Sequence, residues 1–216
     1  MPDAGALPHA LTLDRPESAL RLFAYTLLCP SRFLPARGLL RDLTAAPDAR
    51  MGNVLRRWVL LQINLAPYLL TADMLPDPDR PDTQLRLGDT LLVSPVLTEE
   101  GAAETYLPAG RWTNLLDGTV RTGGVVRSMH GANTAPIYVR ENAVLPVAFC
   151  DRRVRSVYAD QVTLHWFQPA EEAVCVLPNG EKWQLWHGAD GFSAETDSVL
   201  PWHLIVHVGD EERMIR

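Results

Sequence analysis

The carboxylates are the side chains of this chain best suited to acid, base or nucleophilic chemistry, but none of them stands in a catalytic motif. Asp42, Asp48 and Asp73 are predicted at helix ends or in loops, where capping and solvation account for an acidic residue. Asp89 and Asp117 fall at predicted β-turns, where aspartate is favoured for backbone reasons. The pattern therefore favours structural roles for these five residues.

The remaining polar groups give no stronger signal. The acidic runs 99–100 and 210–212 are predicted as solvated turn and tail charges. His203 and His207 share one face of a predicted strand but lie roughly 13 Å apart, too far to share a metal without other ligands. His130 opens a predicted loop. Three serines lack the glycines of a nucleophile elbow: Ser31, Ser94 and Ser128.

We therefore predict no catalytic residue, no metal site and no cofactor, and we assign no substrate-binding residue. Tryptophans leave one binding hypothesis open, because a group of them could form an aromatic platform for sugars or could fill a β-sandwich core. Since Trp183 and Trp186 are three residues apart, they are predicted on opposite faces of a strand. The full group is Trp166, Trp183, Trp186 and Trp202.

Composition bounds the class of protein. The chain has 216 residues, 47% of them hydrophobic, which suffices for one large or two modest domains. Its net charge of −6 lacks the basic excess of nucleic-acid-binding proteins, so we expect no nucleic-acid partner. The longest apolar stretch, 58–70, is broken by polar residues and a proline, and the N-terminus lacks a secretion signal. We expect a soluble cytoplasmic protein with no membrane contact.

The cysteines agree with a reducing compartment. Cys29, Cys150 and Cys175 are far apart, and none has a metal-ligand spacing. We expect reduced thiols in the core.

The first third of the chain is predicted to be helical. Residues 18–28 follow a capping segment at 14–18. Residues 53–75 form the strongest predicted helix, with Asn53 as its cap and apolar residues over most of its circumference. Pro67 is expected to bend or divide this helix.

After a predicted linker at 76–82, the chain is expected to form short strands joined by turns. Tight turns are predicted at 108–110, 117–118 and 179–180. The predicted strands are 91–93, 104–107, 111–116, 125–129, 137–140, 144–149, 162–166, 173–177, 182–187 and 203–208. Many short strands with regular turns favour one or two β-sandwiches.

Three segments in this β region share residues with a known family. Gly88–Val96 is similar to a Gly-x-x-Leu-Leu-Val-Ala-Pro-Val strand, and Tyr106–Trp112 to a Tyr-Leu-Pro-x-Gly-x-Trp turn. Pro136–Pro146 is similar to Pro-Val-Phe-Val-Arg-x-Gly-Ala-Ile-Ile-Pro. In order and spacing these segments resemble the C-terminal region of glycoside hydrolase family 31, the α-glucosidase and α-xylosidase family. More weakly, 57–70 resembles its last barrel helix and 173–180 its distal hairpin.

The resemblance implies a (β/α)8 barrel followed by two β-sandwich domains, and retaining hydrolysis by two aspartates on barrel strands. Those aspartates precede the matched region in the family, so we expect the chain to lack them and to be inactive alone. Four departures suggest relaxed constraint, and the first is that the stretch joining the helix at 57–70 to the β-sandwich is shorter than the family's usual one. No histidine follows Phe33-Leu-Pro35, Asn142 replaces a glycine, and Pro178-Asn179 replaces a double aspartate.

We therefore predict an α+β protein. Residues 1–86 are predicted as a helical remnant of a barrel, 87–150 as a proximal β-sandwich, and 151–216 as a shortened distal one. Three functional hypotheses stay open. The chain is an inert truncated product, or it docks on a barrel-bearing glycosidase chain or a second copy of itself, or it is a carbohydrate-binding module.

Overall fold

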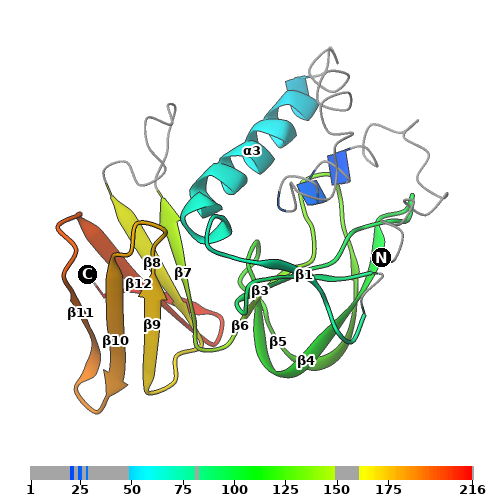
Figure 1. Ribbon diagram of the computed structural model, residues 1–216. Helices are drawn as coiled ribbons and strands as arrows, with labels where there is room; N and C mark the ends of the chain where they lie inside the picture. The colour runs from blue at the N-terminus through cyan, green and yellow to red at the C-terminus, as the bar shows by residue number, and fades with distance from the viewer. Residues whose placement is uncertain are drawn as a thin grey trace, which may run out of the picture.

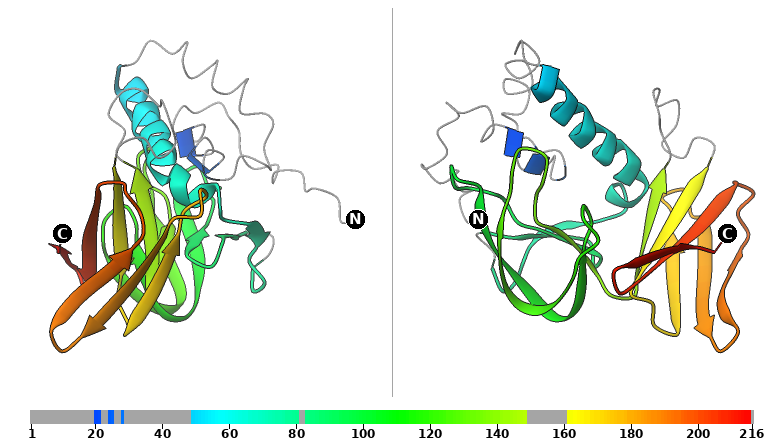
Figure 2. Two further views of the ribbon diagram at one scale, coloured as in Figure 1. Left: turned by 60° about the vertical axis from the view of Figure 1, so that its left-hand side comes forward. Right: turned by 180° about the vertical axis from the view of Figure 1, so that it is seen from behind.

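The computed structural model describes residues 20–21, 24–25, 28, 49–80, 83–148 and 161–215 (Figure 1). One long helix, α3, lies above the junction of two β regions, which we call the proximal sheet and the distal sandwich (Figures 1 and 2). All described positions between 20 and 28 are helical, which confirms the predicted helix there. Arg21 joins this helix to the proximal sheet, since its Nη1 donates to the Thr98 carbonyl at 2.8 Å.

Helix α3 spans Ala49–Leu69 and begins four residues before the predicted cap. Asn53 is therefore an exposed residue inside the helix, and the prediction that it caps the helix is wrong. Pro67 lies inside the helix without dividing it. Only two helical residues follow Pro67, so its missing amide removes a hydrogen bond at the very end, where the cost is small.

One side of α3 is buried against both β regions. Leu55, Trp58 and Leu65 belong to a cluster that also contains residues of the proximal sheet and the distal sandwich. The Trp58 indole N–H donates to the Ala132 carbonyl at 2.9 Å. Arg56 is exposed, so the helix is less evenly buried than its apolar sequence predicts.

The proximal sheet has six antiparallel strands in the order β1-β2-β3-β6-β4-β5. Their bounds are Met74–Pro76 (β1), Leu85–Leu87 (β2), Leu91–Val93 (β3), Ala102–Asn114 (β4), Val120–Met129 (β5) and Ile137–Arg140 (β6). Because β1 pairs with β2, the predicted linker at 76–82 is part of a connection within this sheet. A proline is tolerated in β1 because the strand lies at the sheet edge.

The middle of the proximal sheet is buried on both faces. Leu91 and Val93 pack in the cluster shared with α3. Leu92 packs on the other face with Leu107 and Trp112 of β4, where the sheet curls. The continuous apolar run of β3 is therefore that of a strand covered on both sides, as predicted.

Strand β4 corrects one prediction. Residues 108–110 do not form a turn between two strands, because β4 runs through them as one strand of 13 residues. Its pairing with β5 shifts register between Leu107 and Arg111, which marks a bulge. The indole N–H of Trp112 donates to the Pro108 carbonyl at 2.9 Å, so the bulged backbone gains a partner within its own strand.

The distal sandwich packs a four-stranded sheet, β13-β12-β8-β7, on a three-stranded sheet, β11-β10-β9. The strand bounds are Ala143–Ala148 (β7), Val162–Phe167 (β8), Glu172–Val176 (β9), Lys182–Gly188 (β10), Gly191–Thr196 (β11), Trp202–Val208 (β12) and Glu211–Met214 (β13). Strands β8 and β12 pair in parallel, whereas the other described pairs are antiparallel. Fully buried Trp166, Trp183 and Leu204 lie in the core between the sheets.

Each predicted strand overlaps an observed one, with 104–107 and 111–116 both falling in β4, but four observed strands were not predicted: β1, β2, β11 and β13. Strands β11 and β13 were not predicted, because β11 has few strongly apolar residues and β13 is exposed throughout. The hairpins at Gly118 and Gly180 form, with φ of 75° and 90°. The proposed division into 1–86, 87–150 and 151–216 stays a prediction. Within the described residues, the proximal sheet begins at Met74 and the distal sheet at Ala143.

Candidate functional site

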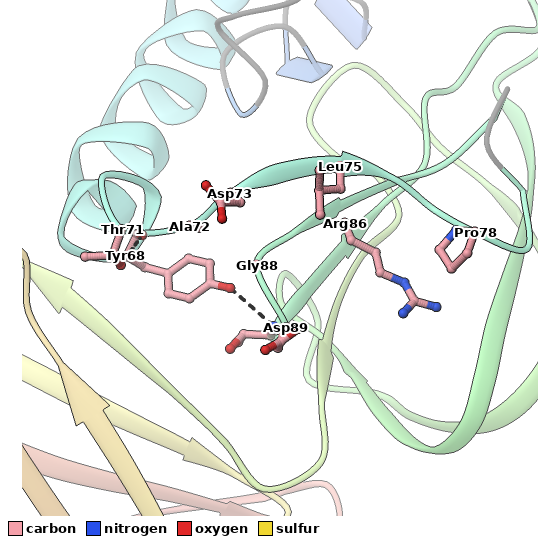
Figure 3. A pocket seen from close by; sticks show the side chains of 10 residues that line it. Tyr68, Thr71, Ala72, Asp73, Leu75, Pro78, Arg86, Gly88 and Asp89 are labelled. Carbon is pink, nitrogen blue, oxygen red and sulfur yellow. Dashed lines mark hydrogen bonds between the residues drawn. The ribbon is translucent and has the colours of Figure 1, made fainter.

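The clearest candidate site is a groove where the end of α3 meets the proximal sheet (Figure 3). It encloses about 620 Å³ and is open to solvent. We call it the junction groove. It is lined by Tyr68, Thr71, Ala72, Asp73, Leu75, Pro78, Arg86, Gly88, Asp89 and Thr90.

Tyr68 connects α3 to the proximal sheet across this groove through two hydrogen bonds, which we call the brace. Its hydroxyl donates to the Leu87 carbonyl and accepts from the Thr90 amide at 3.2 Å. The second of these bonds is the dashed line in Figure 3. Burial raises the pKa of Tyr68, so the phenol stays protonated and can donate at neutral pH. The last turn of α3 is thereby bonded to the turn between β2 and β3.

Gly88 lets the brace form. Its φ is +57°, and a Cβ added there would lie 2.5 Å from the Tyr68 hydroxyl and 3.4 Å from the Ala72 side chain. The Gly88 amide also donates to the Asp73 carbonyl at 2.7 Å. Any other residue would strain the backbone and displace Tyr68.

An ion pair forms one end of the groove. The carboxylate of Asp77 is fully buried and accepts from Arg86 Nε at 2.8 Å. Its other oxygen accepts from the Asp79 amide at 2.8 Å. A buried carboxylate that kept no such partners would be costly, so these contacts account for its burial. Arg86 is partly exposed, its Nη2 lies 3.7 Å from the Asp79 carboxylate, and its side chain extends towards Pro78 (Figure 3).

Two predicted structural aspartates meet in this groove. Asp73 follows α3 and Asp89 lies in the turn between β2 and β3, as their sequence positions predicted. Both carboxylates are exposed. A glycosidase requires two carboxyl groups held rigidly beside the bond that is cleaved, whereas these two lie exposed in a loop and a turn. The groove can accept and donate hydrogen bonds, which suits binding more than bond cleavage.

The other acidic candidates divide between turns and strands. Asp117 occupies the predicted turn, where its carboxylate accepts from the Thr119 amide at 2.9 Å. Glu211 and Glu212 are exposed, as predicted for solvated charges, but they lie in strand β13 and not in a tail. Arg213 lowers the pKa of Glu211 through a hydrogen bond and its charge. Asp42 and Asp48 lie outside the described residues.

Ser128 and His130 form a pair that sequence reasoning did not foresee. Their Oγ and Nε2 atoms are 2.7 Å apart, and His130 opens a loop as predicted. Burial lowers the pKa of His130. A catalytic triad needs an acceptor on the opposite ring nitrogen, and His130 Nδ1 is buried with no hydrogen-bond partner among the described residues. Ser94 is buried and Ser31 lies outside the described residues.

Two histidines meet in the distal sheet. His207 of β12 does not pair with His203 but with His165 of β8, whose Nδ1 lies 2.9 Å from His207 Nε2. Phe167 stacks on His207 with ring centroids 4.2 Å apart. Burial lowers the pKa of each histidine to about 4. The parallel pairing of β8 with β12 creates this contact, and sequence gave no signal of that pairing.

Among the described residues, no three histidine, cysteine, aspartate or glutamate side chains gather as metal ligands would. Cys175 is a buried free thiol, as predicted, and burial raises its pKa to about 12. Cys29 and Cys150 lie outside the described residues. None of the described helices is both long enough and apolar enough to cross a membrane.

Most of the tryptophans of the distal sandwich lie in its hydrophobic core. Trp166 and Trp183 are fully buried, and Trp202 is 9% exposed. Trp186 is half-buried and points to the opposite side of β10 from Trp183, as its spacing predicted.

Asn142 departs from the family pattern, but this departure does not reflect relaxed constraint, because the residue has a structural role. Its φ is +58°, the region that favours glycine, and asparagine is among the residues that tolerate it best. Its side chain donates to the Glu172 carbonyl at 2.9 Å and accepts from the Trp166 indole at 3.0 Å. Asparagine therefore keeps the turn and adds contacts to the distal sandwich.

Fold and groove together define the class of this region: a helix braced against antiparallel β-domains. Residues 66–145 match the profile described as the glycosyl hydrolase family 31 C-terminal domain. The comparisons therefore support a glycoside hydrolase family 31 C-terminal region within residues 66–145 of this chain.

Two curated relatives share this region. The α-xylosidase XylQ of Lactiplantibacillus pentosus is 34% identical over 95 residues, which cover 40% of this chain and 12% of the relative. The α-glucosidase of Saccharolobus solfataricus is 33% identical over 72 residues, covering 33% of this chain and 10% of the relative. The chain thus matches only a small part of either enzyme's length.

Comparison with a solved structure shows that the similarity of fold extends beyond residues 66–145. The cycloalternan-forming enzyme of Listeria monocytogenes superposes with a TM-score of 0.73 at 19% identity, covering 88% of this chain and 22% of that one. Residues 74–216 make up only about two thirds of this chain, so the shared fold includes part of the chain before β1.

Proposed function

We propose that these 216 residues are the non-catalytic, C-terminal scaffold of a family 31 α-glycosidase and do not hydrolyse glycosides by themselves. In this proposal α3 is the last helix of a (β/α)8 barrel, and the proximal sheet and distal sandwich support that barrel. The complete glycosidase, barrel included, would act in carbohydrate metabolism, as the names of the relatives indicate.

The observation that carries the proposal is the strand pattern. A (β/α)8 barrel closes from eight parallel strands and presents its catalytic residues at their ends. The described residues contain a single parallel pair, β8 with β12, and it lies within a sandwich. The two carboxylates of the junction groove are exposed and lie in a loop and a turn, not at the ends of barrel strands.

The test is an activity assay of the purified chain on chromogenic α-glucosides and α-xylosides. We expect no sugar release above a mock purification. A double variant, Asp73→Asn with Asp89→Asn, serves as the matched control, because it removes both groove carboxylates. Release by the wild-type chain that this variant abolishes would overturn the proposal, whereas release by both proteins at the same rate indicates a contaminant.

A second candidate is an accessory subunit that completes a split glycosidase. It is favoured by α3, because Val54, Val59 and Leu61 are only partly buried against the described residues. Partly buried apolar side chains on a long helix suit a further packing surface. A barrel-bearing chain that co-purifies and restores hydrolysis supports this candidate, and a monomer that restores none excludes it.

A further inference from the structure

We propose that the outer face of sheet β9–β11 is a carbohydrate-binding surface centred on Trp186, and that it takes an oligosaccharide of α-linked glucose units. The choice of sugar rests on the proposed function, whereas the surface itself is argued from the distal sandwich alone. This sheet lies on the side of the sandwich away from the proximal sheet (Figures 1 and 2).

The orientation of Trp186 follows from the alternation of β10. Trp183 and Leu185 point inward and are fully buried, so Trp186 and Gln184 point outward. Trp186 is the one tryptophan of the distal sandwich that lies outside its core, since the other three belong to the core cluster. Its indole N–H has no hydrogen-bond partner among the described residues.

The neighbours of Trp186 on this face are given by strand register. Glu172 of β9 and Ser193 of β11 lie directly opposite it, and both are exposed. Directly opposed side chains on one face have Cβ atoms about 5 Å apart. A carboxylate and a hydroxyl therefore stand on either side of the indole.

The next row of side chains on this face also combines apolar and polar groups. Gln184 of β10 lies between Val174 of β9 and Glu195 of β11. Val174 is 55% exposed, which extends the apolar surface beside Trp186. Three strands about 4.8 Å apart make a strip roughly 10 Å wide, the scale of one or two sugar rings.

This chemistry fits a neutral sugar. The C–H groups on one face of a pyranose ring carry partial positive charge, and the π face of an indole carries partial negative charge. Flanking carboxylate, amide and hydroxyl groups match the ring hydroxyls as hydrogen-bond partners. The exposed apolar residues are too few for a stable protein interface, which buries about 800 Å² on each partner.

The experiment is calorimetric titration of the intact chain with maltotetraose and isomaltotriose. We expect saturable binding in the millimolar range, weakened at least about tenfold by Trp186→Ala. Trp186→Tyr should restore much of the affinity, because it keeps an aromatic face. Val125→Ala, on the exposed side of β5, is the matched control and should bind as the wild type does.

The outcomes separate this proposal from the proposed function, because binding is measured without hydrolysis. Absence of binding at high millimolar sugar overturns the Trp186 site and leaves the inactivity prediction standing. Binding that survives Trp186→Ala and falls with Asp89→Asn places the sugar in the junction groove and also overturns it. A wild-type dimer that dissociates on Trp186→Ala would show that a second copy of the chain occupies this face.

Discussion

The proximal sheet and the distal sandwich are both β structures, yet different interactions hold them in place. In the proximal sheet, side chains bond to backbone far away in the sequence. Tyr68 reaches Leu87, and the Gln84 amide both donates to and accepts from the backbone of Tyr106. The distal sandwich has such bonds at its edge, where the Gln168 amide both donates to and accepts from the Gly209 backbone. Its core, however, is apolar and includes the fully buried indoles of Trp166 and Trp183.

This difference accounts for which part of the chain is recognisable in sequence. A side chain that bonds to a particular backbone group cannot be exchanged freely, and neither can a glycine such as Gly88 at positive φ. An apolar core tolerates exchange of residues of similar volume. The family match accordingly covers 66–145 and ends as the distal sandwich begins.

The largest effect should come from the distal core. Trp166→Ala should destabilise the chain by about 3–5 kcal/mol, because it removes a fully buried indole and leaves a cavity. Urea denaturation gives the free energy, and hydrogen exchange shows where protection is lost. If the two regions are held separately, β8 and β12 lose protection while β3 and β6 keep it.

Trp186→Ala is the matched control, because this side chain lies outside the core. It should cost less than about 1 kcal/mol. Equal loss of protection in both regions on Trp166→Ala would show one cooperative unit. The cluster that joins Leu145 and Phe167 to α3 would then be the connection between them.

Much of the fold followed from the sequence, for reasons visible in particular elements. Strand β3 was predictable because its burial on both faces leaves a continuous apolar run. Asn142 was recognised as a departure, but its positive φ and its bonds to the distal sandwich could not be read from one sequence.

The bulge in β4 was predicted as a turn, because proline and glycine at 108–110 are typical of both structures. The groove was missed for a similar reason. Asp73 and Asp89 were predicted correctly as loop and turn residues, but only the pairing of β1 with β2, and of β2 with β3, brings them into one groove. Local patterns specify turns, whereas long-range pairing decides which turns meet.

A smaller effect, dependent on pH, should again distinguish the distal sandwich. Burial keeps the pKa of His165 near 4 in the folded chain, against about 6.5 when unfolded. Between these values the unfolded chain binds more protons, so stability falls as pH drops from about 6.5 towards 4. This loss belongs to His165 and His207 together, because the two imidazoles are in contact and protonation of one disfavours protonation of the other.

Urea titrations across this range measure the slope, and two variants interpret it. The double variant His165→Gln with His207→Gln should flatten the slope, because both paired imidazoles are removed. His187→Gln, at an exposed position of β10, should leave it unchanged. The groups facing the pair include Glu212, whose carboxylate lies 3.9 Å from His207 Nδ1. A slope that persists in the double variant would assign the acid sensitivity to other groups.

The smallest of these effects tests the brace of the proximal sheet. Gly88→Ala should cost about 2 kcal/mol, because the new Cβ adopts a positive φ and meets the Tyr68 hydroxyl. Gly118→Ala is the matched control: its φ is also positive, but its Cβ would meet nothing within 4 Å. The difference between the two variants isolates the contact with Tyr68.

A double-mutant cycle makes this test specific. Tyr68→Phe removes the hydroxyl that the Gly88→Ala side chain would strike, so the double variant should be less destabilised than the sum of the single variants. Strict additivity would mean that Gly88 and Tyr68 act independently. The contact between the new Cβ and the Tyr68 hydroxyl would then add nothing to the cost of Gly88→Ala, and the positive φ alone would account for that cost.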